Sequence, residues 1–172
     1  MELFRERGYD LTTVEEIARR AGLTERTFFR YFADKREVLF SGSAALRQLF
    51  VSGVTGAPQS AGPMDALAVA LDAVAAAFAE RRDFARRRQP VITSNTDLLE
   101  RELIKLATLA AAVAAALRER GVPEPAASVT AETGIAVFKV GFERWVAPGE
   151  TRGLEELLRE ALDALRSVTS AD

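Results

Sequence analysis

Apolar residues recur along the chain every three to four positions, and no segment alternates apolar and polar residues as a strand requires. The spacing predicts helices over residues 13–21, 24–31, 37–50, 64–82, 84–92, 96–120, 125–146 and 151–168. The breaks between them are short, and the clearest is the stretch GAPQSAGP, which has the composition of a loop. We therefore expect an all-α protein.

The first two predicted helices have clear start and stop signals. Thr13 and Glu16 form a T-x-x-E capping box, in which each side chain bonds the other residue's backbone N–H. An apolar stripe follows at Val14, Ile17, Ala18 and Ala21. Gly22 then allows the chain to leave the helix, and Thr24 is placed to cap the next one. Two helices joined this tightly cross steeply, as in a helix-turn-helix.

The second of these helices has one apolar and one basic side. At about 100° per residue, Phe28 and Phe32 point inward, while Arg26 and Arg30 lie nearly opposite. Arginine matches the guanine edge in the major groove of DNA, and a threonine methyl or an aromatic ring can touch a thymine methyl. The candidates for base reading are therefore Arg26, Thr27, Phe29 and Arg30, and the candidates for phosphate contact at the rim are Thr12, Thr13, Tyr31 and Lys35. An ordinary helical hairpin with solvated arginines is the alternative.

The stretch GYDLTTVEEIARRAGLTERTFFRYFADKREVLF resembles the N-terminal domain of TetR-type transcriptional repressors. The resemblance implies that Glu25 joins the base-reading residues and that Thr13, Tyr31 and Lys35 hold DNA phosphates. It also implies a three-helix DNA-binding domain over residues 1–40, followed by a helical effector-binding and dimerisation domain over residues 41–172. Many members carry tyrosine where this chain has Phe29, so Phe29 offers only apolar contact.

In such proteins the segment MELFRERGY is the later part of a longer first helix. We expect that native residues precede it and that the first helix is truncated here. So short a helix is marginal in water. Leu3 and Phe4 would then anchor it against Ile17 and Phe28.

The larger C-terminal part offers a candidate effector pocket. The run LATLAAAVAAAL in the predicted helix 96–120 is apolar on every side, which favours burial all round, either by other helices or beside a pocket. The stretch from RRRQPV to this run, with the later FERWV, is similar to the C-terminal domains of actinobacterial TetR-type regulators. The residues that we expect to line the pocket are Phe78, Phe84, Asn95, Thr96, Phe138, Phe142 and Trp145, with an ordinary aromatic core as the alternative.

An arginine cluster precedes the long helix and comprises Arg81, Arg82, Arg86, Arg87 and Arg88. Such a cluster could attract an anionic ligand such as an acyl-CoA, or it could be a solvated surface.

The last two predicted helices favour self-association. Glycine inside a helix costs about 1 kcal/mol relative to alanine, so Gly134 and Gly141 suggest a close helix approach. We predict a homodimer built as a four-helix bundle, which the TetR resemblance also implies. The interface residues would be Gly134, Val137, Gly141, Leu154, Leu158, Leu162 and Leu165. Packing within one chain is the alternative.

The composition of the chain excludes several kinds of functional site. The 172 residues carry a net charge of −2, and residues 1–40 hold eight basic and eight acidic side chains, so DNA binding has to rely on a local basic patch. Cysteine and histidine are absent, which excludes disulfides, thiolate ligands, the usual zinc sites and the usual general base. We predict no catalytic residues, no metal and no cofactor. The longest apolar run, residues 106–117, is too short to span a bilayer, and a cytoplasmic location fits the missing cysteines.

The predicted function is that of a TetR-like regulator, a repressor that binds a palindromic double-stranded DNA operator as a homodimer. A small-molecule effector in the C-terminal part would release it. Two alternatives remain open. One is an enzyme that uses carboxylates in a helical cavity, and the other is a helical dimeric ligand-binding or interaction protein with impaired DNA binding.

Overall fold

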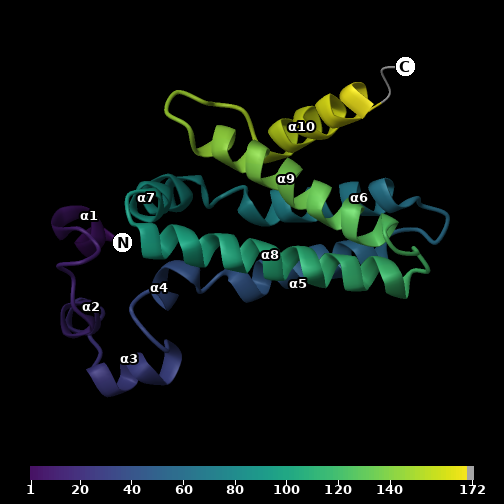
Figure 1. The fold of residues 1–172 in the computed structure, drawn as a ribbon. Coiled ribbons are helices and arrows are strands. Elements are labelled where there is room, and N and C mark those ends of the chain that lie inside the picture. The colour runs from purple at the N-terminus through teal and green to yellow at the C-terminus, as the bar shows by residue number, and fades with distance from the viewer. Residues whose placement is uncertain (170–172) are drawn as a thin grey trace.

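The computed structural model describes residues 1–169, and within this range every regular element is a helix (Figure 1). A small N-terminal head holds α1, α2 and α3, with bounds Glu2–Arg7, Val14–Arg20 and Glu25–Tyr31. Two helices lead into the body, α4 (Glu37–Phe40) and α5 (Ser43–Gly56). The body continues with α6 (Pro63–Phe78), α7 (Arg82–Thr93), α8 (Thr96–Glu119), α9 (Ala126–Val146) and α10 (Leu154–Thr169). The predicted all-α fold is confirmed.

One large apolar core holds the body together. Helices α5, α6, α8 and α9 pack around it, and α10 covers α9 and α6 (Figure 1). Phe50, Leu67 and Leu117 are completely buried in this core. Removing a side chain of this size from water stabilises a fold by roughly 1.5–3 kcal/mol.

A second, smaller core joins the head to the body. Phe4 of α1 lies against Leu39 and Phe40 of α4 and against Ile92 and Leu98 of α7 and α8. The expected anchoring of α1 by Phe4 is therefore present, and Ile17 of α2 packs against this core as predicted. Phe28 does not belong to the core, and α4, α7 and α8 supply the other partners. The head thus rests on the end of the body formed by α7 and the start of α8 (Figure 1).

Two sequence expectations about the helices need correction. The helix predicted over residues 37–50 is broken at Ser41 and Gly42, where the Ser43 hydroxyl donates to Phe40 O at 2.7 Å. The apolar half of α8 is not buried all round, because Ala107 and Ala111 are exposed. They line a hollow of about 230 Å³ that also contains Arg118 and Glu132. Alanine side chains are too short to fill the space between α8 and α9 there.

None of the helices in residues 1–169 is long and apolar enough to cross a bilayer.

Candidate nucleic-acid interface

The turn between α2 and α3 is built by the residues that the sequence identified. Thr13 Oγ1 accepts from Glu16 N at 3.2 Å, and Glu16 Oε2 accepts from Thr13 N at 3.0 Å, so the capping box is complete. Gly22 has a φ of +68°, a backbone conformation that residues with a side chain rarely adopt. Thr24 caps α3 by accepting from Thr27 N at 3.2 Å. The predicted helix-turn-helix is confirmed.

Helix α3 turns one face inward and the opposite face to solvent. Phe28 is 1% exposed, and its ring lies 5.1 Å from that of Phe32 and 5.4 Å from that of Phe29. Arg26 and Arg30 are exposed, as the helical phase predicts, and Phe29 is 53% exposed on the flank. The outward face therefore combines two guanidinium groups with an exposed aromatic ring.

The outward face is positively charged although the head is neutral overall. Acidic residues of the head pair with other arginines: Glu2 with Arg20, Glu16 with Arg7, and Asp34 with Arg36. In the described part of the chain, neither Arg26 nor Arg30 forms an ion pair. On the outward side of α3 these two positive charges outnumber the one exposed carboxylate, that of Glu25, which forms an ion pair with neither of them.

Two residues predicted to contact phosphates are instead bound within the head. Lys35 Nζ donates to the carbonyl oxygens of Tyr9 at 2.7 Å, Asp10 at 3.3 Å and Thr12 at 2.9 Å, and it lies 4.3 Å from the centre of the Tyr9 ring. An ammonium group has three donors, and all three are used here. Thr12 is 1% exposed, and its hydroxyl donates to Gly8 O at 2.7 Å. Both predictions are therefore corrected, because these side chains fix the turn between α1 and α2.

The other two phosphate candidates are accessible. Thr13 is exposed at the start of α2, although its oxygen already accepts the capping bond. Tyr31 is 65% exposed, and its hydroxyl accepts from Arg30 Nη2 at 2.9 Å. Glu25 and Thr27 lie on the same helix as Tyr31, exposed and half-buried respectively.

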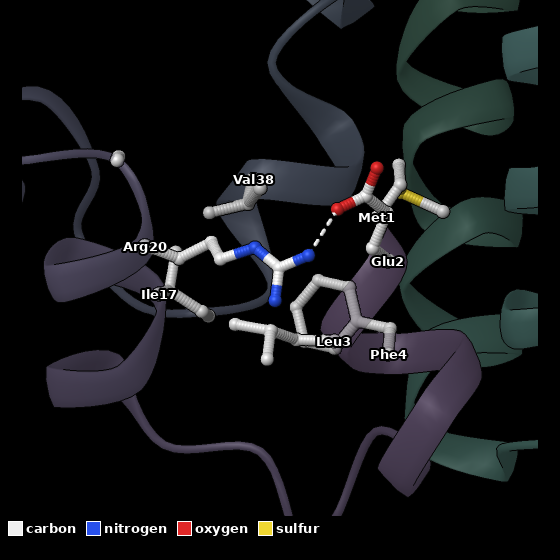
Figure 2. Close-up of a pocket in the computed structure, with 8 residues that line it drawn as sticks. Met1, Glu2, Leu3, Phe4, Ile17, Arg20 and Val38 are labelled. Carbon is white, nitrogen blue, oxygen red and sulfur yellow. Dashed lines mark hydrogen bonds and ion pairs between the residues drawn. The ribbon is translucent and has the colours of Figure 1, made fainter.

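A hollow of about 300 Å³ lies inside the head between α1, α2 and α4 (Figure 2). Leu3, Ile17 and Val38 form its apolar walls, and an ion pair between Glu2 and Arg20 crosses it at 2.5 Å. No residue of α3 lines it. It is therefore separate from the outward face of α3.

Only part of the predicted effector pocket comes together. The rings of Phe78, Phe138, Phe142 and Trp145 form one cluster between α6 and α9, with neighbouring centroids 5.7–6.4 Å apart. Phe84 is exposed and takes no part in these ring contacts, and Thr96 is also exposed. Asn95 caps α8 through Leu98 N at 3.1 Å and donates to Asp10 Oδ1 at 3.2 Å. Neither hollow described above is lined by the aromatic cluster.

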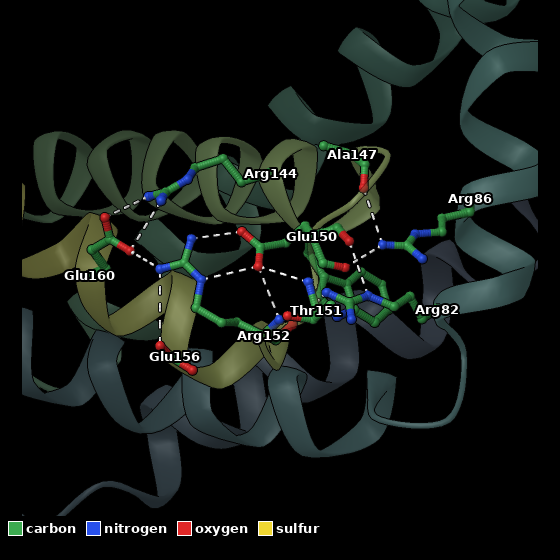
Figure 3. Close-up of polar contacts among 10 residues, drawn as sticks. Arg82, Arg86, Arg144, Ala147, Glu150, Thr151, Arg152, Glu156 and Glu160 are labelled. Atoms are coloured by element: carbon green, nitrogen blue, oxygen red, sulfur yellow. Dashed lines mark hydrogen bonds and ion pairs between the residues drawn. The ribbon is translucent and has the colours of Figure 1, made fainter.

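The arginine cluster of α7 has structural partners that the sequence did not reveal (Figure 3). Arg82 donates to Trp145 O at 3.1 Å and to Arg152 O, and Arg86 donates to Ala147 O at 3.1 Å and Glu150 O at 2.6 Å. Burial, and then the charge of Arg86, lower the pKa of Arg82. These two arginines hold the loop between α9 and α10, whereas Arg81 and Arg87 are exposed.

A third arginine of α7 connects the body to the linking helix α4. Arg88 Nε donates to Leu39 O at 2.7 Å, its Nη1 donates to Glu102 Oε1 at 3.0 Å, and the guanidinium lies 5.1 Å from the centre of the Phe40 ring. Burial lowers the pKa of Arg88, although Glu102 opposes this. The phase of α7 could have indicated such a role, because Arg88 lies on the same face as the buried residues Ala85 and Ile92.

Glu37 of α4 makes a second connection to the body. Its carboxylate accepts from Arg101 Nε at 2.9 Å and lies 3.4 Å from Lys105 Nζ, both on α8. Burial alone would raise the pKa of Glu37, but the hydrogen bond from Arg101 and the charge of Lys105 lower it overall. Helix α4 is therefore tied to α7 and α8 by directed polar bonds.

The predicted dimer residues pack within their own chain. A side chain at Gly134 would overlap Leu67 of α6, and one at Gly141 would overlap Leu158 of α10. The close helix approach was correctly inferred, but the neighbour is intramolecular. The other predicted interface residues also face the chain's own core, with Leu165 only partly buried: Val137, Leu154, Leu158, Leu162 and Leu165. The large apolar residues that α9 and α10 leave exposed are Val129, Val140 and Val168.

Comparisons with known proteins agree with this architecture. The model of the family described as bacterial regulatory proteins, tetR family, matches residues 1–41. FadR of Thermus thermophilus, a TetR-family transcriptional repressor solved in complex with lauroyl-CoA, is 30% identical with a TM-score of 0.58, and the likeness covers 96% of this chain and 89% of FadR. The chain belongs to the TetR family.

Two further TetR-family proteins are similar over different lengths. PfmR, also from Thermus thermophilus, is 26% identical with a TM-score of 0.54, over 95% of this chain and 92% of PfmR. The HTH-type transcriptional regulator TcmR of Streptomyces glaucescens is 39% identical over 74 residues, which are 43% of this chain and 33% of TcmR. The match with TcmR thus spans about a third of that protein's length. Membership of the TetR family makes this chain a transcriptional regulator.

Proposed function

We propose that this TetR-family regulator binds a double-stranded DNA operator through α3, represses transcription there and is released by a small-molecule effector. One observation carries the proposal. Arg26 and Arg30 are exposed on the side of α3 opposite the buried Phe28, and neither forms an ion pair within residues 1–169. Two exposed guanidinium groups without an acidic partner on one helix face suit the edges of guanine in the major groove.

The two proposed functions would be divided along the chain. Residues 1–40 form the DNA-reading part, and residues 41–172 bind the effector and dimerise. Base edges would be contacted by Glu25, Arg26, Thr27, Phe29 and Arg30. Thr13 would hold a phosphate at the rim, whereas Thr12 and Lys35 keep the head in shape.

The homodimer would form through the outer faces of α9 and α10. Val129 and Val140 are exposed on α9, and Val168 is exposed on α10. A second copy on these faces would give two reading heads related by a twofold axis, which matches a palindromic operator. Val140→Asp should convert the dimer to monomers by light scattering. Val69→Asp, at an exposed valine of α6, is the matched control and should leave the dimer intact.

The effector would be a small molecule with an apolar chain. FadR was solved with lauroyl-CoA. In this chain the apolar region that we propose for such a ligand is the aromatic cluster of Phe78, Phe138, Phe142 and Trp145. An acyl chain inserted among these rings would spread α6, α8 and α9. The bonds from Arg88 of α7 to Leu39 O and from Arg101 of α8 to Glu37 would carry that displacement to α4 and the head.

The chain's one tryptophan provides a direct test of the effector site, because Trp145 belongs to the cluster. Lauroyl-CoA should change the Trp145 fluorescence in a saturable way and release bound DNA over the same concentrations. Coenzyme A without an acyl chain should do neither. A fluorescence response to lauroyl-CoA without release of DNA would contradict the proposed coupling.

Operator binding is tested by an electrophoretic shift with the intergenic DNA beside the protein's own gene. The protein should retard this fragment in the presence of excess unrelated DNA, and Arg26→Ala combined with Arg30→Ala should not. Equal binding of both proteins would overturn the proposal. It would favour a helical dimer that binds ligands or other proteins without reading DNA.

A further inference from the structure

Arg30 and Tyr31 form a pair on the outward side of α3. Neighbouring residues of a helix diverge by about 100°, so their side chains do not normally meet. Here Arg30 Nη2 donates to Tyr31 Oη at 2.9 Å, and the Arg30 Cζ lies 4.8 Å from the centre of the Tyr31 ring. The guanidinium therefore lies across the tyrosine ring and is held at its hydroxyl end.

No contact with another aromatic ring explains the position of the Tyr31 ring. It is 65% exposed, and among the described aromatic pairs it contacts no other ring. An arginine side chain has many rotamers, and ordering it on binding costs conformational entropy. A ring that already holds the guanidinium removes part of that cost before DNA arrives.

The pair leaves the reading part of the guanidinium free. Nη2 gives one of its two N–H groups to Tyr31, so its other N–H can still form a two-donor fork with Nη1 or Nε, which have no partner in the described residues. Arg26, one turn earlier, makes no cation–π contact and no side-chain hydrogen bond within residues 1–169. The two arginines of the face are therefore unequal, since only Arg30 is oriented in advance.

We propose that Tyr31 is a positioning residue that orients Arg30 for base reading, and that the base pair read by Arg30 is consequently discriminated more strictly than the one read by Arg26. This inference rests on the proposed function, because it assigns how the operator is read. Tyr31 then acts through Arg30 and not as an independent phosphate contact.

A double-mutant cycle tests this role. Duplexes are first selected from a random library with the wild-type protein. The affinities of wild type, Arg30→Ala, Tyr31→Leu and the double variant are then measured on the selected sequence and on its single-base variants. Arg30→Ala should lower discrimination at one base pair by about 10-fold or more. Tyr31→Leu should lower it at the same base pair by about two- to five-fold, the range expected for an exposed cation–π contact.

The double variant distinguishes a role of Tyr31 through Arg30 from an independent role. With Arg30 removed, Tyr31→Leu should change neither the affinity nor the base preference further. Tyr31→Phe, which keeps the stacked ring, should retain most of the discrimination in the Arg30 background. Arg26→Ala should leave the effect of Tyr31→Leu intact, because Arg26 does not touch that ring.

Other results would overturn the inference. If Tyr31→Phe weakened all duplexes alike, and did so equally with and without Arg30, Tyr31 would be a phosphate contact. A uniform loss with a lowered unfolding temperature would make it a structural residue. A wild-type protein that selects no common sequence would overturn the proposed function itself. A wild type that selects one sequence, with additive variants, would overturn only the role of Tyr31.

Discussion

The head and the body of this protein are stabilised by different kinds of contact. The body has a continuous core of large apolar side chains, and its helices approach closely at Gly53, Gly134 and Gly141. Over residues 1–38 the buried apolar side chains are only Phe4, Ala18 and Phe28. Directed polar bonds, such as those of Lys35 and of the capping residues, fix the remainder of the head.

This difference suits what each part has to do. A helix held by its caps and by one buried phenylalanine can keep its other side free for DNA. A large apolar core leaves no such surface free. A change of packing in one part of it, however, displaces the helices that share the core. Substitutions that change volume should therefore act mainly on the body, and substitutions that remove polar bonds should act mainly on the head.

The largest effect should come from shortening a core aromatic residue. Phe50→Ala removes a fully buried ring that packs edge-on to Phe138 at 5.6 Å, and should lower the free energy of unfolding by about 3–5 kcal/mol. Phe29→Ala is the matched control in the head, where the ring is 53% exposed, and should cost about 1 kcal/mol or less. Urea unfolding measures both. Similar losses would contradict the contrast between the two parts.

A single methyl group should also disturb the body. The Cβ of an alanine at position 53 would overlap the backbone of Ala70, and a helix backbone cannot move aside as a side chain can. Gly53→Ala should therefore cost about 3 kcal/mol, near the upper end for overpacking. Gly56→Ala, in the same helix with open space around it, should be neutral or stabilising. Thermal unfolding of the two variants would show whether close packing of α5 on α6 matters as much as inferred.

Sequence alone predicts the parts of this structure that depend on near neighbours. Thr13, Glu16, Gly22 and Thr24 act on residues at most four positions away, so their spacing was sufficient to place α2 and α3. The inward turn of Phe28 followed from helical phase in the same way. These local patterns were therefore sufficient to predict α3 and the exposure of Arg26 and Arg30.

The contacts that sequence missed connect distant residues. Lys35 bonds carbonyl groups 23 to 26 positions earlier, and Arg82 and Arg86 bond carbonyls 61 to 70 positions later. The spacing of Gly134 and Gly141 showed that helices come close, but not which helices. A neighbour of this kind is set by the packing of the whole body, which no local pattern encodes.

Lys35 offers an intermediate effect that separates a structural from a DNA-binding role. Lys35→Met keeps a long side chain but removes three bonds to carbonyl groups, and should lower the unfolding free energy by about 2 kcal/mol. Affinity for all duplexes should fall together, because the head loses its shape. The dependence of affinity on salt should keep its slope, since no phosphate contact is lost. A slope reduced by about one unit would instead make Lys35 a phosphate ligand.

The smallest effect concerns a part of the body that is held in the same way as the head. In the loop between α9 and α10, hydrogen bonds from the Arg152 side chain and from backbone N–H groups lower the pKa of Glu150 from 4.5 to about 2 (Figure 3). Because the folded pKa is the lower one, the ionised carboxylate stabilises the loop above about pH 4.5. That contribution is lost as the pH falls towards 2.

Carboxyl chemical shifts and unfolding temperatures between pH 5 and pH 2 would test this for the wild type and Glu150→Gln. The difference in unfolding temperature between the two proteins should shrink as the pH falls through this window, because protonated Glu150 no longer holds the Arg152 bonds better than glutamine does. Glu119→Gln removes an exposed carboxylate that bonds nothing in residues 1–169, and controls for the change in charge. A constant difference for Glu150→Gln would mean that the charge of Glu150 does not stabilise this loop, and that the bonds from Arg82 and Arg86 to its carbonyl groups hold it without that charge.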